Sequence, residues 1–162
     1  MYQKIMVPLD GSELAECVLP HVESIAKGCS VPNVILVRVV EPALLPTGTL
    51  SDGGDVFTEE DAKRIRMATD SAQKATAESY LDQMVSRLSS EGVNVKAEVL
   101  VGKAAETLAE YAEKNDVDLI VMATHGRSGV TRWVRGSVAE KILRSSKIPV
   151  LMVRAPGTEE GT

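Results

Sequence analysis

Short apolar runs alternate with longer stretches whose apolar residues recur every three or four positions. The runs at 33–40 and 118–123 are almost continuously apolar and rich in β-branched residues. Such runs are typical of central strands in a parallel sheet, because both faces of that sheet are covered. The strands expected on this basis are 4–9, 33–40, 94–101, 118–123 and 148–153.

The intervening stretches predict helices at 13–27, 59–90, 104–114 and 137–146. Gly28 is expected to act as a left-handed C-terminal cap of the first helix, and Pro20 should kink or split that helix. The second and fourth helices each open with capping-box spacing. The pairs are Thr58 with Asp61 and Ser137 with Glu140.

The longest helix, 59–90, carries one apolar stripe near its end and should close at Gly92. Its apolar residues follow the spacing i, i+3, i+4, i+7, which places them on one face of a helix. They are Leu81, Met84, Val85 and Leu88. We expect this stripe to be buried.

Strand and helix therefore alternate along the whole chain, which favours right-handed crossovers and an open, doubly wound, five-stranded parallel sheet. One α/β domain is expected over residues 1–154. The segment 41–57 is rich in Pro, Gly and Ser and is expected to be a mobile surface loop. Residues 155–162 are expected to form a disordered tail.

Composition narrows the class of partner. The chain has 162 residues and a formal net charge of −5, which argues against nucleic acid as the main partner, because phosphate backbones require a basic surface. No apolar run approaches the roughly 20 residues of a membrane helix, so we expect no membrane partner and a cytoplasmic location. Cys17 and Cys29 are too few for a disulfide framework and are expected to be reduced and buried.

One stretch is unusual for an acidic chain. The segment 122–137, "MATHGRSGVTRWVRGS", gathers glycines and arginines between the fourth expected strand and the helix at 137–146. Ligands of such sheets bind at the carboxyl ends of the strands, and a helix N-terminus there offers free N–H groups to an anion. Glycines let the backbone approach a phosphate closely. The same glycines would also suit a plain turn. Ser137 could serve only as a helix cap, and the arginines could be solvated surface residues. The residues alone therefore leave both interpretations open.

The segments "KIMVPLDGSELAE" (4–16), "VILVRVVEP" (34–42), "DLIVMATHGRSG" and "RGSVAEKILRSSKIPVLMVR" resemble the universal stress protein family, and the likeness runs over roughly residues 2 to 154. The nucleotide-binding branch of that family carries G-x-x-G, nine residues, then G-[S/T]. Gly126, nine residues, Gly136 and Ser137 match this pattern, and Ala123 replaces its first glycine. The resemblance implies a Rossmann-like fold of the adenine nucleotide α-hydrolase kind.

The resemblance also implies a binding site for ATP or AMP. Asp10 would hydrogen-bond the nucleoside, although its carboxylate could equally cap the first helix through Ser12 and Glu13. The other implied contacts are the wall residues Pro8 and Leu9, Val39 at the adenine, Met122 and Ala123 at the base and ribose, and Gly126, Arg127, Gly129, Gly136, Ser137 and Val138 at the phosphates. Mg²⁺, where present, would be bound through the phosphates.

No Ser-His-Asp set, Walker lysine or paired carboxylates support catalysis. The favoured function is a nucleotide-binding stress sensor or regulator with at most slow ATP hydrolysis. The alternatives are a genuine ATPase or phosphotransferase and a nucleotide-free interaction scaffold with an unidentified protein partner. The last strand should lie at the sheet edge, and the resemblance implies a homodimer through it that buries Val150 and Met152. The 41–57 loop would act as a partial lid.

Overall fold

The computed structural model describes residues 1–43, 58–124 and 137–155. Strands and helices alternate in the predicted order, and the strand ends lie within two residues of those expected. The elements are β1 (Lys4–Pro8), the 3₁₀ helix η1 (Ala15–Val18), α1 (Leu19–Gly28), β2 (Asn33–Val40), α2 (Glu59–Ser90), β3 (Val95–Val101), α3 (Ala104–Lys114), β4 (Leu119–Thr124), α4 (Ser137–Ser145) and β5 (Val150–Arg154).

All five strands are parallel, in the order β3-β2-β1-β4-β5. The chain moves outward from β1 through β2 to β3, then crosses back to the other side of β1 for β4 and β5. Reversal of the winding direction beside β1 makes the sheet doubly wound, which confirms the predicted fold class. As expected, β5 pairs on one side only within the described sheet, with β4.

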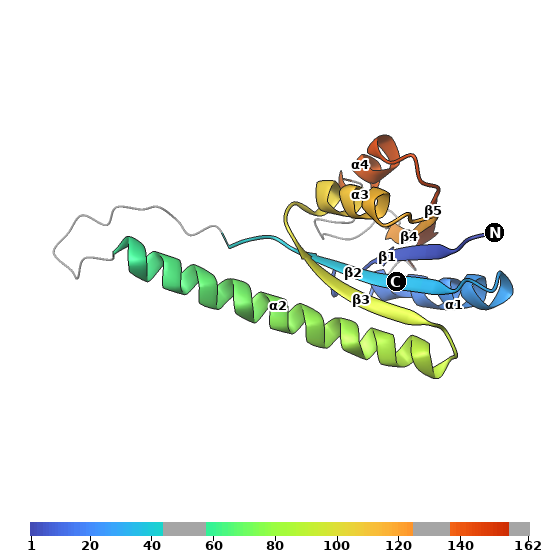
Figure 1. Ribbon diagram of the computed structural model, residues 1–162, viewed down its shortest axis with the longest axis horizontal. Helices are drawn as coiled ribbons and strands as arrows, with labels where there is room; N and C mark the ends of the chain where they lie inside the picture. Colours follow the sequence, from blue (N-terminus) through green and yellow to red (C-terminus); the bar gives the residue numbers. More distant parts are fainter. Residues whose placement is uncertain (44–57, 125–136, 156–162) are drawn as a thin grey trace, which may run out of the picture.

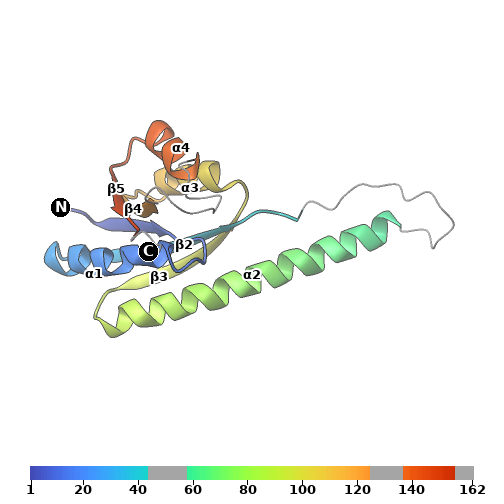
Figure 2. The same cartoon turned by 180° about the vertical axis from the view of Figure 1, so that it is seen from behind.

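Two helical layers cover the sheet, α1 and α2 on one face and α3 and α4 on the other (Figure 1; Figure 2, from behind). Side chains alternate between the two resulting cores along each strand. In β1, Ile5 and Val7 join the core beneath α1 and α2, whereas Met6 joins the core beneath α3 and α4. Burial on both faces explains why the central strands read as continuous apolar runs.

The first helix is split, as Pro20 predicted, but it ends differently from the expectation. Pro20 lies in the first turn of α1, where a missing N–H removes no helical bond. Gly28 is the last residue of α1 and does not have a positive φ; Ser30 does, at 51°. The N–H of Val31 donates to the carbonyl of Ala26 (2.9 Å), which closes a Schellman-type end. Because the burial of Val31 sets this end, the prediction of Gly28 as the left-handed cap is wrong.

Both cysteines are free thiols, as expected. The expectation that they are buried is wrong: Cys17 is half-buried, and Cys29 is exposed because it follows the last residue of α1 at the surface. Partial burial raises the pKa of the Cys17 thiol.

Helix α2 has the predicted bounds, and local interactions specify both its ends. Thr58 and Asp61 form the capping box, with the Asp61 N–H donating to Thr58 Oγ1 (3.2 Å) and the Thr58 N–H to Asp61 Oδ2 (3.2 Å). At the other end Gly92 has a φ of 83°, and the Val93 N–H donates to the Leu88 carbonyl (3.2 Å). The predicted stripe packs on the sheet, with Leu81 fully buried.

The first half of α2 projects away from the sheet (Figures 1 and 2). Ala77 is its first buried residue. Isolated helices of this length are marginal in water, so the half before Ala77 depends on its cap and its side-chain pairs. One such pair joins Glu60 to Arg64 at 3.7 Å.

We therefore expect Thr58→Ala to fray the projecting half of α2 while leaving the midpoint of global unfolding nearly unchanged. Loss of an N-cap costs about 1 kcal/mol. Here that cost falls on a segment of α2 with no buried residue before Ala77, whose described bond to the rest of the fold is the Ala43 N–H donating to Asp70 Oδ1 (3.1 Å). Hydrogen-exchange mass spectrometry should show faster exchange in peptides from the first half. Thr76→Ala removes a hydroxyl that bonds only the Ala72 carbonyl (2.9 Å) and is the matched control. Unchanged exchange in Thr58→Ala would contradict this expectation.

In the part of the chain that the structure describes, no helix combines the length and the apolarity needed to cross a membrane.

Candidate functional site

The candidate site lies where β1 and β4 run side by side and the winding direction reverses. Met6 of β1 is in register with Ile120 of β4, so their carboxyl ends emerge at one edge of the sheet. The crossovers that follow β1 and β4 lead to helices on opposite faces of the sheet, and ligands of open α/β sheets bind at such a reversal. The predicted nucleoside residues therefore belong to neighbouring strands.

Asp10 follows β1 and is held in a tight turn. One carboxylate oxygen, Oδ1, accepts from the Ser12 N–H (2.9 Å) and from Ser12 Oγ (2.6 Å). Ser12 Oγ in turn accepts from the Ala15 N–H (3.2 Å) at the start of η1. The capping interpretation of Asp10 is correct in part: Oδ1 bonds Ser12, but no described hydrogen bond joins Asp10 to Glu13, and Ser12 Oγ is the group that bonds the start of the first helix. No described residue donates to Oδ2, which is the oxygen available to a ligand.

Apolar predicted residues flank this turn on both faces of the sheet. Val39 at the end of β2 and Met122 in β4 are buried in the core beneath α3 and α4, and Val138 of α4 packs against that core. Leu9 is buried on the opposite face, and Ala123 packs beside it. Pro8 is buried in register with Val37. The structure brings these residues together around the carboxyl ends of β2, β1 and β4.

The predicted phosphate loop falls largely outside the described residues. Gly126, Arg127, Gly129 and Gly136 lie there. The description resumes at Ser137, the first residue of α4, followed by Val138. Helix α4 spans nine residues, so its first N–H groups have no partner within the helix and its N-terminus is the positive end of a helix dipole.

Sequence reasoning missed a cluster beside Asp10. Arg38 of β2 lies against the backbone of Gly11, and its guanidinium carbon is 5.3 Å from the centre of the Tyr80 ring in α2. Tyr80 donates to Glu16 (3.1 Å), whose second carboxylate oxygen lies 4.0 Å from Arg87. A signal was present: Arg38 is the one charged residue in the apolar run 33–40.

The sequence profile of the universal stress protein family matches residues 1–154. The chain belongs to the universal stress protein family. A relative of similar length is universal stress protein MJ0531 of Methanocaldococcus jannaschii, 32% identical over 162 residues, which cover 98% of this chain and 86% of the relative.

Solved structures of this family have the same fold. The structure of MJ0577, also from Methanocaldococcus jannaschii, matches with a TM-score of 0.76 at 27% identity, over 98% of this chain and 99% of the other. A universal stress protein in complex with cAMP matches with a TM-score of 0.66 at 21% identity (96% and 98% covered). An Arabidopsis thaliana family member with AMP bound matches with a TM-score of 0.61 at 15% identity (99% and 97% covered).

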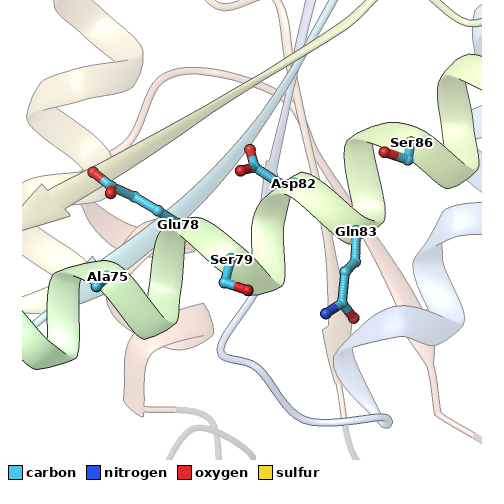
Figure 3. A pocket seen from close by; sticks show the side chains of 6 residues that line it. All are labelled: Ala75, Glu78, Ser79, Asp82, Gln83 and Ser86. Carbon is cyan, nitrogen blue, oxygen red and sulfur yellow. The ribbon is translucent and has the colours of Figure 1, made fainter.

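A hollow of about 460 Å³ lies along α2 of this universal stress protein, and none of its lining residues is a predicted site residue. Figure 3 shows these lining residues. They all come from α2: Ala75, Glu78, Ser79, Asp82, Gln83 and Ser86. The two carboxylates in this lining would repel a phosphate. The hollow is therefore a poor candidate for a nucleotide site.

Within residues 1–43, 58–124 and 137–155, no three His, Cys, Asp or Glu side chains are grouped so that they could hold a metal ion. Binding of Mg²⁺ stays a prediction.

Proposed function

We propose that this universal stress protein binds an adenine nucleotide, ATP or AMP, at the carboxyl ends of β1, β2 and β4 and acts as a stress-response sensor or regulator. One observation carries the proposal: Asp10 lies at the reversal of the winding direction, with Oδ1 bonded to its own turn and no described residue donating to Oδ2. Two structures of the same fold were solved with cAMP or AMP bound, which supports this class of ligand.

The chemistry of the site suits a nucleoside. A carboxylate with a fixed orientation accepts hydrogen bonds from vicinal ribose hydroxyls, as acidic residues do in other nucleotide-binding α/β folds. Val39 and Met122 would supply an apolar wall for the adenine ring, and backbone groups at the end of β2 would hydrogen-bond to the edge of that ring. The phosphates would extend toward the N-terminus of α4, where unpaired N–H groups favour an anion.

At most slow hydrolysis is expected from such a site. Phosphate positioning at a helix N-terminus lowers the barrier to hydrolysis somewhat without a dedicated base. A steady-state assay should therefore show less than about one turnover per minute, far below the roughly 10 per second of a median enzyme. Sustained faster turnover would identify a genuine ATPase or phosphotransferase instead.

Asp10→Asn tests the site. The new side chain keeps an oxygen that can accept from Ser12, but it presents an N–H₂ donor where Asp10 Oδ2 accepts. We expect ATP, AMP and adenosine each to bind at least about ten-fold more weakly, the effect of losing one hydrogen bond to a charged group, with little change in melting temperature. Isothermal calorimetry with the three ligands measures this effect.

Two variants are the controls for this experiment. Ser12→Ala should weaken binding less than Asp10→Asn does, because the Ser12 N–H still donates to Asp10 Oδ1 and Oδ2 is unchanged. Asp82→Asn makes the same chemical change on an exposed position of α2 and should leave binding unchanged. A parent protein that binds none of the three ligands would exclude the nucleotide site and favour the scaffold alternative.

A further inference from the structure

Arg38 places a charged side chain inside one of the two apolar layers. It follows Val34 and Leu36 on the face of β2 that packs beneath α1 and α2. Arg38 itself is half-buried. No ion pair joins it to any described carboxylate. A guanidinium taken from water in this way needs other interactions to offset the lost hydration.

The first such interaction is a close approach to the β1 turn. A Cβ built on Gly11 would lie 2.9 Å from Arg38 Nη1 and 3.0 Å from Cζ. The space beside Gly11 is therefore filled by the guanidinium plane. Gly11 also has a φ of 87°, which disfavours other residues at this position. Gly11 lies between Asp10 and Ser12, so Arg38 supports the turn that orients the Asp10 carboxylate.

The second interaction is with α2. The Arg38 guanidinium carbon lies 5.3 Å from the centre of the Tyr80 ring, within the range of a cation–π contact. The Tyr80 hydroxyl donates to Glu16 Oε1 (3.1 Å). Burial raises the pKa of Tyr80, and the nearby carboxylates of Glu16 and Asp10 raise it further, so this hydroxyl stays a donor. Tyr80 thus contacts the same guanidinium that packs on Gly11.

We propose that Arg38 is a positioning residue for nucleoside binding, held by its contacts with Gly11 and Tyr80 so that it fixes the Asp10 turn. The inference rests on the proposed function and deepens it, because it names a residue outside the ligand contacts that sets their geometry. Arg38 acts through its flat shape and its π contact. Lysine, a compact ammonium on a flexible stem, cannot replace it.

Calorimetry with adenosine and ATP tests the role in a set of variants. Arg38→Met keeps an unbranched apolar stem and should weaken both ligands by the same factor, about ten-fold. Arg38→Lys keeps the charge and should not rescue affinity. Tyr80→Phe keeps the ring and should weaken binding less than Tyr80→Leu does. Arg66→Met, on an exposed position of α2, is the matched control and should bind as the parent does.

Each other outcome overturns the inference in an identifiable way. Loss of affinity for ATP alone would mean that Arg38 contacts a phosphate. A lower melting temperature with unchanged affinity for both ligands would mean that Arg38 only stabilises the fold. Rescue by Arg38→Lys would mean that charge, not shape, matters. A parent that binds neither ligand would overturn the proposed function itself, whereas a parent that binds and an Arg38→Met variant that matches it would overturn the Arg38 inference alone.

Discussion

A Gly136→Val variant is expected to bind ATP at least about 100-fold more weakly than the parent protein, because several phosphate hydrogen bonds would be lost together. Gly136 lies outside the described residues, and in the chain it directly precedes Ser137, where α4 begins. A β-branched side chain at that position would occupy the space in which a phosphate oxygen meets the N–H groups of the helix. Adenosine, which has no phosphate, should lose much less affinity.

Calorimetry with ATP and adenosine measures this difference, and circular dichroism checks the fold. Gly136→Ala should give an intermediate loss, because it adds one methyl group. Gly28→Val is the matched control: a Cβ at Gly28 meets no atom within 4 Å, and its φ is not positive. If folded Gly136→Val binds ATP as tightly as the parent, the glycines of 122–137 serve only the turn.

Lysine substitutions on β5 are expected to convert a homodimer into a monomer. In the described sheet β5 is an edge strand, with backbone groups on its outer side that can pair with a second chain. Leu151 is 37% exposed, and Val150 and Met152 are half-buried. We propose that a two-fold axis beside β5 joins two copies and covers these side chains. The lysines would place unpaired charges in that interface.

Light scattering should give about twice the 17.4 kDa chain mass for the parent and the single chain mass for Met152→Lys and Val150→Lys. Leu151→Lys is included as a second test, because position 151 is more exposed in the single chain and a lysine there should not unfold the protein. Met67→Lys, on the projecting half of α2 where Met67 is 63% exposed, is the control and should stay dimeric. A parent that is monomeric at micromolar concentration would exclude the dimer.

Local interactions explain which elements were predictable. The bounds of α2 were predicted correctly because its capping box and its Gly92 terminus lie within a few residues of the ends they specify. The strands β1, β2 and β4 were predictable because burial on both faces of the sheet leaves a nearly continuous apolar run in each of them. The end of α1 was not predictable from the sequence. Burial of Val31 against the sheet, and not the presence of a glycine at position 28, decides which residue takes the positive φ.

The candidate site also has a part that the sequence predicted and a part that it did not. The residues around the strand ends were found from the sequence because the carboxyl ends of parallel strands meet at one edge, so the order of strand and loop suffices to place Asp10 and Val39 near each other. The contacts of Arg38 with Gly11 and Tyr80 were not found, because they join the turn after β1, β2 and α2 across segments far apart in the chain.

Apolar periodicity and capping signals are properties of neighbouring residues and are read from the sequence alone. The strand order β3-β2-β1-β4-β5 and the partners of a half-buried arginine depend on how the layers pack, so only the tertiary structure decided them.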